Sequence, residues 1–152
     1  ASASAIFNRF TQCFDDNFPI AKQILVTPKN KLKECGLSTN KLATIIEIAN
    51  QEENEGLENR KGFEIMSDIQ IIQKLTKIKG IGEWTAQMLM IFNLGKLDIF
   101  PVGDFALKKN YSLFKNIASP INMKDLSKIS EEWKPFRSIA AWYLWKYKLK
   151  SC

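Results

Sequence analysis

The chain has 152 residues, of which 45% are apolar and 25% are charged, and its formal net charge is +6. These proportions are typical of a soluble globular protein, and we expect residues 1–152 to form a single domain with its own core. The sequence contains no histidine, which excludes Ser-His-Asp and Cys-His catalytic sites and any histidine-ligated metal centre. Any chemistry must come from carboxylates, lysine, cysteine, tyrosine or the backbone.

No apolar run in the sequence approaches the length of a membrane span, so we expect no membrane partner. The three cysteines, Cys13, Cys35 and Cys152, lie far apart along the chain. Their odd number and their spacing predict a reducing compartment, with neither a disulfide framework nor a metal-binding knuckle. That compartment would be the cytoplasm of a prokaryote or the nucleus of a eukaryote.

Positive charge is concentrated in the second half of the chain. Residues 1–73 carry 8 basic and 10 acidic groups, whereas residues 74–115 and residues 116–152 each carry 7 basic and 3 acidic groups. This distribution is expected if the second half faces a polyanion such as DNA. A simpler explanation stays open, because the excess of lysine over arginine also agrees with an AT-rich coding sequence.

The first part of the chain predicts a series of helices. Residues 3–14 are rich in helix formers, and their apolar residues share one face. A short helix is predicted between Thr27-Pro28, an N-cap followed by proline, and Gly36, which would end it. Ser38 is predicted to cap the next helix.

A polar loop and two apolar helices are predicted next. Residues 51–62 are polar and indicate a loop. Ser67 is predicted to start a helix whose apolar residues are spaced three apart: Ile69, Ile72, Leu75 and Ile78. After the glycine-rich turn at residues 80–82, a second helix is predicted to carry Trp84, Met88 and Ile91 on one face.

The last third of the chain predicts a broken loop and further helices. Residues 93–103 contain glycine and proline that interrupt the helix, and Asp104 stands where the following helix should begin. Further helices are predicted over residues 124–133 and from Pro135 to about Lys148. No alternating strand pattern or repeat interrupts the series, so the predicted fold is all-α, a compact helical bundle.

The stretch Gly80-Ile81-Gly82 lies between two predicted helices and indicates a helix-hairpin-helix motif. Glycine permits a positive φ and leaves no Cβ between the turn and a docked ligand. The free N–H groups of the turn and of the following helix start suit a phosphate and do not read base sequence. Taken alone, the motif is equally well explained as a close corner between two helices.

The motif is part of a wider pattern made of three stretches: "KGIGEWTAQM", which contains it, "DIFPVGD" and "WKPFRSIAAWYLW". The combination resembles the helix-hairpin-helix DNA glycosylase superfamily, most closely the DNA-3-methyladenine glycosylase II group, and the resemblance covers essentially the whole chain. In that family a further N-terminal segment usually precedes the part that matches "ASAIFNRF". The resemblance therefore predicts that this chain is N-terminally truncated relative to the family.

The resemblance makes Asp104 the catalytic carboxylate. Removal of a base from deoxyribose passes through a cationic, oxocarbenium-like sugar, which a fixed carboxylate stabilises while it orients the attacking water. An ordinary helix N-cap would also explain an aspartate at this position. The rival carboxylate, Asp98, matches a structural position in the family, and Arg137 matches an ion-pair position near the start of the last helix.

The resemblance assigns the pocket for the base to Trp84, Met88 and Trp145. Related bifunctional glycosylases have lysine at the position of Trp84, so hydrolysis by water without lyase activity is implied. Indole faces would favour a cationic alkylated purine by about 0.5–2 kcal/mol. Core packing is the alternative for each tryptophan. Well-known members can have an aromatic residue at the position of Met88, which leaves the substrate range open.

The resemblance also implies contacts to the DNA backbone and a structural cation. The backbone contacts are expected at Lys79, Gly80, Ile81, Gly82, Glu83 and Lys108. Lys79 replaces the proline that the family usually has there, and a solvated helix face would explain Lys108 equally well. In this family the hairpin often holds Na⁺ or K⁺, here through the backbone carbonyls of Thr76, Ile78 and Ile81. No cofactor is expected to be required.

The function implied is base excision repair by a monomeric, monofunctional DNA glycosylase. It would bind double-stranded DNA, flip the damaged nucleotide and hydrolyse the N-glycosidic bond of alkylated purines of the 3-methyladenine type. Two alternatives stay open. In the first, the chain is a catalytically inert helix-hairpin-helix module that binds DNA. In the second, it is a glycosylase for another damaged base such as uracil, hypoxanthine or an oxidised purine.

Overall fold

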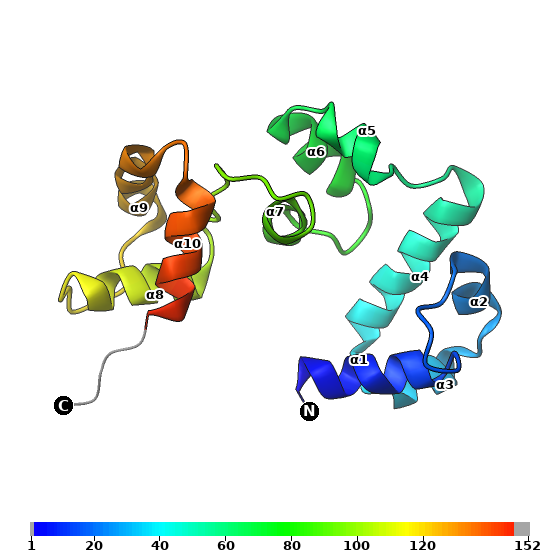
Figure 1. Ribbon diagram of the computed structural model, residues 1–152. Helices are drawn as coiled ribbons and strands as arrows, with labels where there is room; N and C mark the ends of the chain where they lie inside the picture. Colours follow the sequence, from blue (N-terminus) through cyan, green and yellow to red (C-terminus); the bar gives the residue numbers. More distant parts are fainter. Residues whose placement is uncertain (1, 148–152) are drawn as a thin grey trace. The chain divides into compact units, whose positions relative to one another are not determined.

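The computed structural model describes residues 2–147, which form helices and turns without any strand (Figure 1). In chain order the helices are α1 (Ala3–Gln12), α2 (Ala21–Val26), α3 (Lys29–Glu34), α4 (Thr39–Asn54), α5 (Arg60–Glu64), α6 (Asp68–Leu75), α7 (Glu83–Phe92), α8 (Phe105–Phe114), α9 (Met123–Ser130), the 3₁₀ turn η1 (Glu131–Trp133) and α10 (Arg137–Lys146). The all-α prediction is confirmed. Within residues 2–147, none of these helices is long and apolar enough to cross a membrane.

The chain divides into two compact units, Ala1–Ile81 and Gly82–Cys152. The boundary falls inside the Gly80-Ile81-Gly82 turn, so α1 to α6 belong to the first unit and α7 to α10 to the second. The expectation that residues 1–152 act as one domain stays a prediction.

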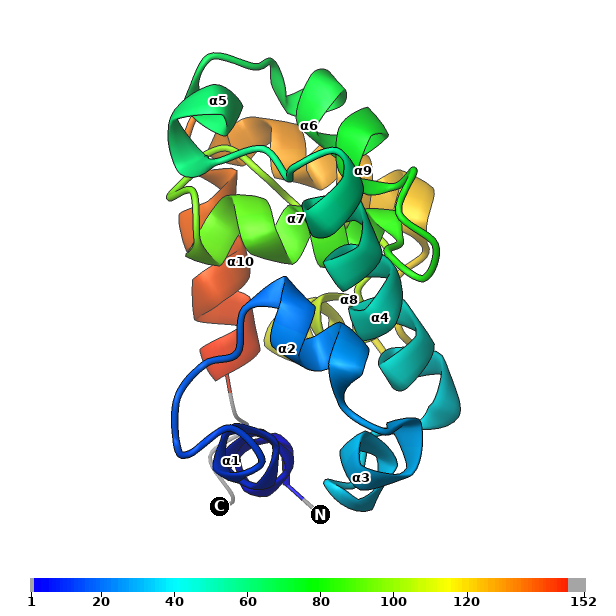
Figure 2. The same cartoon turned by 90° about the vertical axis from the view of Figure 1, so that its right-hand side faces the viewer.

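The first unit is built around α4, the longest of its helices. Helices α2 and α3 pack against α4, as Figures 1 and 2 show. The core of this unit is formed by apolar side chains of helices α1 to α4 and of the residues that follow α1 and α3: Phe10, Phe14, Ile24, Leu32, Cys35, Leu42 and Ala49. Ser38 starts α4 as predicted, since its hydroxyl accepts a hydrogen bond from the Lys41 amide.

Two predictions in the first unit are wrong. The loop expected at residues 51–62 is helical at both ends, because α4 continues to Asn54 and α5 begins at Arg60. The glutamates and glutamine at the end of α4 are good helix formers, so their polarity marks an exposed helix face rather than a loop. Thr27 does not cap α3: it is the C-cap of α2, and its hydroxyl donates to the Gln23 carbonyl of that helix at 2.7 Å, while Pro28 precedes α3.

The apolar face predicted for residues 69–78 is confirmed only in part, because Leu75 and Ile78 are buried as expected but Ile69 is not. Ile71 and Leu75, four residues apart, are buried, whereas the side chain of Ile69 is 68% exposed. A spacing of three drifts around a helix with 3.6 residues per turn, and a spacing of four keeps to the core side here. In α7 the buried residues are likewise four apart, Ala86 and Met90.

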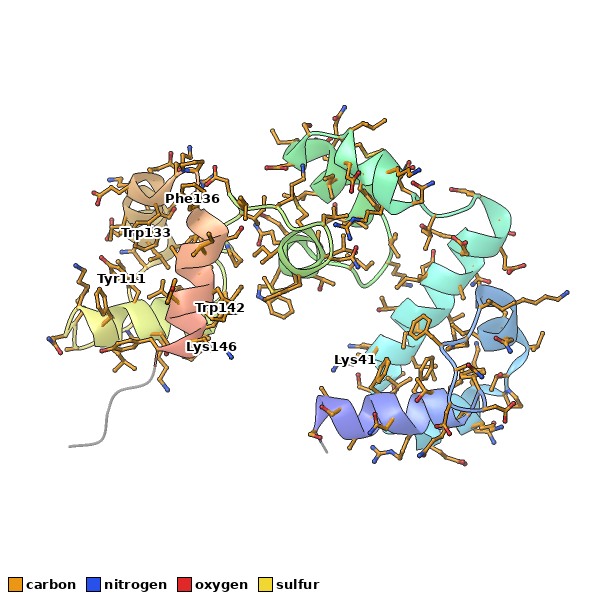
Figure 3. All side chains as sticks on the ribbon, viewed as in Figure 1. Lys41, Tyr111, Trp133, Phe136, Trp142 and Lys146 are labelled. Carbon is orange, nitrogen blue, oxygen red and sulfur yellow. The ribbon has the colours of Figure 1, made fainter. Side chains whose placement is uncertain are left out.

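The second unit has a core formed by the loop before α8 and by α8, α9 and α10. Its buried members are Phe100, Leu107, Tyr111, Leu126, Ala141 and Leu144. The ring of Trp133, in η1, lies against Phe100 and Tyr111 with centroid distances of 5.3 and 6.0 Å. Figure 3 shows Trp133 and Tyr111 in this unit. The helix predicted over residues 124–133 is thus α9 followed by η1. The last helix begins two residues later than predicted, and Lys148 lies outside the described residues.

Candidate active site

Asp104 stands directly before α8 and caps it, as the sequence predicts. Its Oδ1 accepts a hydrogen bond from the Leu107 amide at 2.9 Å, and its own amide donates to the Pro101 carbonyl at 2.8 Å. Asp104 is half-buried, so its carboxylate does not point into a closed interior. The N-terminal end of α8 and the bend at Pro101 together fix the direction of the side chain.

The second carboxylate oxygen of Asp104 is held by Trp84. The indole Nε1–H of Trp84 donates to Asp104 Oδ2 at 2.7 Å, and the Trp84 side chain is 51% exposed. Each oxygen of the carboxylate therefore accepts one hydrogen bond from a neutral donor and keeps a further lone pair. Trp84 lies two residues after Gly82 in the chain, so this bond connects the predicted carboxylate to the start of the helix that follows the glycine turn.

The loop that leads to Asp104 is clamped at its other end by Asp98 and Arg137. Arg137 Nε donates to Asp98 Oδ1 at 2.7 Å and Arg137 Nη2 donates to Asp98 Oδ2 at 3.0 Å, a bidentate pair. Hydrogen bonding from the Arg137 guanidinium holds the pKa of Asp98 below its ordinary value, against the opposing effect of desolvation. An ion pair was expected at Arg137, and the structure shows that Asp98 is its partner.

Ser138 adds a second clamp that the sequence analysis missed. Its hydroxyl oxygen accepts a hydrogen bond from the Ile99 amide at 2.9 Å. The hydroxyl can donate to the Lys96 carbonyl at 2.8 Å or to the Ile99 carbonyl at 3.0 Å. The Ser138 amide donates to the Leu97 carbonyl at 2.8 Å. The single serine inside the apolar run of the last helix was the available signal, because a buried hydroxyl needs hydrogen-bond partners.

The other two predicted pocket residues are placed differently from Trp84. Trp145 is half-buried in α10, and its ring lies against Phe92 with the centroids 5.7 Å apart. Met88 is half-buried in α7. Neither is joined to Asp104 by a hydrogen bond such as the one that Trp84 makes. Their role as lining of a base pocket stays a prediction.

The remaining tryptophans occupy structural or surface positions. Trp133 packs into the core of the second unit, which confirms the core-packing alternative for this residue. Trp142 is 46% exposed, and the Lys146 ammonium lies 5.6 Å from the centroid of its ring (Figure 3).

Gly80 is required by the backbone of the turn. Its φ is +94°, and a Cβ built there would lie 1.9 Å from Thr44 Oγ1 in α4. Both observations exclude a larger residue without rearrangement. The turn is closed by a hydrogen bond of 3.0 Å from the Ile81 amide to the Ile78 carbonyl, while the neighbouring Lys79 is exposed.

Gly82 differs from Gly80, because it needs no unusual conformation. It precedes α7 with φ −93° and ψ 171°, and a Cβ added there would meet no atom within 4 Å. The space beside this helix start is open. Glu83 accepts a hydrogen bond from Gln87, and Lys108 is half-buried in the first turn of α8. These three residues belong to the second unit, whereas Lys79, Gly80 and Ile81 belong to the first.

The carbonyls predicted to hold a cation all belong to the end of the first unit. Thr76 ends α6, and the Ile78 carbonyl accepts one hydrogen bond, from Ile81. A carbonyl oxygen has two lone pairs, so one remains at Ile78. Three neutral oxygen donors within six residues fit a hard monovalent cation better than a transition metal. Within residues 2–147, no group of three acidic, cysteine or histidine side chains is placed to bind a metal ion.

Known proteins resemble this chain in sequence and in fold. The sequence family described as "HhH-GPD superfamily base excision DNA repair protein" matches residues 1–136. The solved structure of the Schizosaccharomyces pombe 3-methyladenine DNA glycosylase Mag1, in complex with abasic DNA, is similar to 95% of this chain with a TM-score of 0.89 and 34% identity. This chain covers 70% of that structure.

Two curated proteins of Schizosaccharomyces pombe are also similar over nearly all of this chain. The alkylbase DNA glycosidase-like protein mag2 is 40% identical over 148 residues, which are 96% of this chain and 70% of the relative. DNA-3-methyladenine glycosylase 1 is 34% identical over 146 residues, which are 95% of this chain and 64% of the relative. The chain thus spans about two thirds of the length of these relatives. With a family match over most of its residues, the chain belongs to the HhH-GPD superfamily of base excision DNA repair proteins.

Proposed function

We propose that this protein is a monofunctional DNA glycosylase that removes alkylated purines of the 3-methyladenine type from double-stranded DNA. The observation that carries the proposal is the carboxylate of Asp104, fixed by Leu107 and by Trp84 at 2.9 and 2.7 Å. The similar proteins include a 3-methyladenine DNA glycosylase by name, which supports the same substrate class.

Asp104 acts on the sugar of the damaged nucleotide. As the N-glycosidic bond breaks, positive charge develops on the sugar ring, and a carboxylate that is already oriented stabilises this charge without reorganisation. Both hydrogen-bond donors to Asp104 are neutral, so neither of them compensates the negative charge that the sugar cation needs. The lone pairs left on the two oxygens can also accept a hydrogen bond from the attacking water.

Trp84 has two roles in this proposal. Its indole N–H positions Asp104, and its exposed ring face is free to contact the base or the sugar. Tryptophan cannot form a Schiff base with the sugar, so water is the nucleophile and the strand stays intact. Because an alkylated purine is cationic, it leaves without prior protonation, and Trp84, Met88 and Trp145 line its pocket with two indoles and a thioether.

The turn around Gly80 and Gly82 holds the DNA backbone near the damaged nucleotide. The open space beside Gly82 leaves the first amides of α7 accessible to a phosphate oxygen. Lys79 and Lys108 are each proposed to contact the DNA backbone through their positive charge, and Glu83 stands at the start of α7. Flipping the nucleotide costs a few kcal/mol, which is lower for a damaged and weakly paired base and so favours lesions.

The carbonyls of Thr76, Ile78 and Ile81 hold Na⁺ or K⁺ in this proposal. A bound monovalent cation would supply positive charge next to a backbone phosphate. The carbonyls themselves only orient the cation, and the chemistry at the sugar requires no cofactor. We place the protein, as a monomer, with its DNA in the nucleus of a eukaryote or the cytoplasm of a prokaryote.

Release of free base from methylated DNA tests the proposal. The Asp104→Asn variant keeps the shape of the side chain and removes its charge, so we expect base release to fall by about 100-fold or more, by analogy with the loss of one preorganised electrostatic group. Asp125→Asn is the matched control, because Asp125 is exposed on α9 and bonded only locally to Asn122. We expect the control to release base at the wild-type rate.

DNA affinity and a panel of lesions separate the alternatives. If the wild-type protein binds DNA but releases no base from any substrate, it is an inert binding module. If it releases uracil, hypoxanthine or an oxidised purine in preference to 3-methyladenine, the substrate class is wrong while the role of Asp104 stands. Wild-type rates for Asp104→Asn would show that this carboxylate is only a helix cap.

A further inference from the structure

Two of the three cysteines lie side by side in the first unit. Cys13 and Cys35 are 22 positions apart in the chain, and their sulfur atoms are 3.3 Å apart. Both are free thiols in this structure. Their spacing along the chain gave no indication of this contact. Cys152 lies outside the described residues.

The two thiols are held together by the ends of two helices. Cys13 is the C-cap of α1 and Cys35 is the C-cap of α3. The side chain of Arg9, in α1, donates from Nε to the Cys35 carbonyl at 2.9 Å, which ties the two helix ends to each other. Cys35 belongs to the core of the first unit, and Cys13 packs against that core.

The two thiols differ in their access to solvent. Cys13 is half-buried, whereas Cys35 is only 3% exposed. Burial, together with the hydrogen bond to Cys13, raises the pKa of the Cys35 thiol to about 11. The Cys35 S–H also has the carbonyls of Arg9 and Lys31 as acceptors, at 3.5 and 3.6 Å. A reagent in solution therefore reaches Cys13 first, whereas Cys35 is shielded from solvent and stays a protonated thiol.

We propose that Cys13 and Cys35 form an oxidation site, at which a peroxide converts the two thiols into an intramolecular disulfide. The Cys13 thiolate attacks one oxygen of hydrogen peroxide, the O–O bond breaks and hydroxide leaves, giving a sulfenic acid. The Cys35 sulfur then attacks the Cys13 sulfur, the S–O bond breaks, and the oxygen leaves with the Cys35 proton as water. The two thiols lose two electrons, and the peroxide is reduced to water.

The disulfide requires little rearrangement and has a structural effect. The sulfur atoms must approach from 3.3 Å to about 2 Å, a change within reach of side-chain rotation at two helix ends. The bond closes a loop that contains α2 and α3, and it restricts the unfolded chain more than the folded one. Oxidation is thus expected to stabilise the first unit, and a thiol reductant to reverse the effect. This site is independent of Asp104 and of the proposed glycosylase activity.

The test uses the full chain with Cys152→Ser, so that Cys13 and Cys35 are the only cysteines. The protein is treated with hydrogen peroxide, then denatured and labelled with N-ethylmaleimide, and the mass is measured. We expect two labels on the untreated protein, none after oxidation, and one tryptic fragment that contains both cysteines. The melting temperature should rise on oxidation and return with dithiothreitol.

Two further variants test the order of events in the same background. With Cys35→Ser, a dimedone probe should trap the sulfenic acid at Cys13, whereas with Cys13→Ser the buried Cys35 should stay unmodified and keep its label. Two labels on the Cys152→Ser protein after peroxide treatment would overturn the proposal. So would oxidation of Cys13 to the sulfinic acid while Cys35 remains free, and neither result depends on how well the single-thiol variants fold.

Discussion

Asp98 and Asp104 lie six residues apart in the same loop, yet their surroundings are opposite. Asp98 is paired through both carboxylate oxygens with the guanidinium of Arg137, at 2.7 and 3.0 Å. Asp104 accepts hydrogen bonds only from neutral groups, the Leu107 amide and the Trp84 indole. One end of the loop has its charge neutralised within the protein, and the other end keeps its charge.

This difference separates a structural carboxylate from one that is available to a substrate. A carboxylate already bound to a guanidinium offers little to a developing sugar cation, because its charge is compensated. A carboxylate held by neutral donors is oriented but still negative, which is the state that electrostatic catalysis needs. The clamp at Asp98 contributes indirectly, because it anchors the loop whose far end carries Asp104.

The largest expected effect on stability is that of Arg137→Gln. The variant loses the bidentate pair with Asp98, the bond to the Asp98 carbonyl and the bond to Glu131. Because the paired side chains are partly exposed, at 22% and 34%, water compensates in part. We expect the free energy of unfolding to fall by about 2 kcal/mol, measured by urea denaturation.

Arg60→Gln is the matched control for that measurement. Arg60 pairs with Glu64 on the surface of α5, and both side chains are more than half exposed, at 64% and 54%. An exposed pair of this kind contributes about 0.5 kcal/mol or less. Equal losses for the two arginine variants would contradict the view that the Asp98 end of the loop is a clamp.

Trp84→Phe tests the other end of the loop. Phenylalanine keeps a ring face but has no N–H, so Asp104 loses one of its two hydrogen bonds. We expect the rate of base release at saturating DNA to fall by about 10-fold, the equivalent of one hydrogen bond to a charged group, while KM stays close to wild type. Trp142→Phe, an exposed tryptophan outside the site, is the control and should leave both constants unchanged. An increase in KM alone would make Trp84 a binding residue and not a positioning one.

The pairing of Asp98 with Arg137 also makes the stability of the protein depend on pH. The pKa of Asp98 is lowered by Arg137, so the folded protein binds a proton there less readily than the unfolded chain. Its contribution is fully present above the ordinary aspartate pKa of about 3.9 and is lost as pH falls through the lowered value. Asp98→Asn should remove this part of the acid sensitivity in urea unfolding curves, whereas Asp125→Asn should not. An unchanged acid slope for Asp98→Asn would contradict the assignment.

The main features of the fold and the place of Asp104 were predictable from the sequence. Helical spacing, the caps at Ser38 and Ser67 and the aspartate at a helix start are local signals, and local signals survive folding. The positive φ of Gly80 was expected for the same reason. Errors arose where composition was ambiguous, as at residues 51–62, whose glutamates suit a loop and an exposed helix equally well.

The contacts that define the site were harder to predict, because they join residues far apart in the chain. The bond from Trp84 to Asp104 spans 20 positions, and the contact of Cys13 with Cys35 spans 22. Neither contact can be predicted from a local sequence pattern. The family resemblance predicted an ion pair at Arg137 and a structural role for Asp98, but not that these two residues, 39 positions apart, bind each other.

The smallest expected effect is that of Asp104→Asn on stability. Asparagine is as good an N-cap as aspartate, so its amide oxygen can still accept from the Leu107 amide. The amide nitrogen would face the Trp84 N–H, and two donors cannot bond, so we expect a loss of about 0.5 kcal/mol. Urea denaturation of Asp104→Asn beside Arg137→Gln measures the contrast directly. If Asp104→Asn destabilised the protein as much as Arg137→Gln, Asp104 would be a structural residue, and any loss of base release in this variant would follow from unfolding and not from the missing charge.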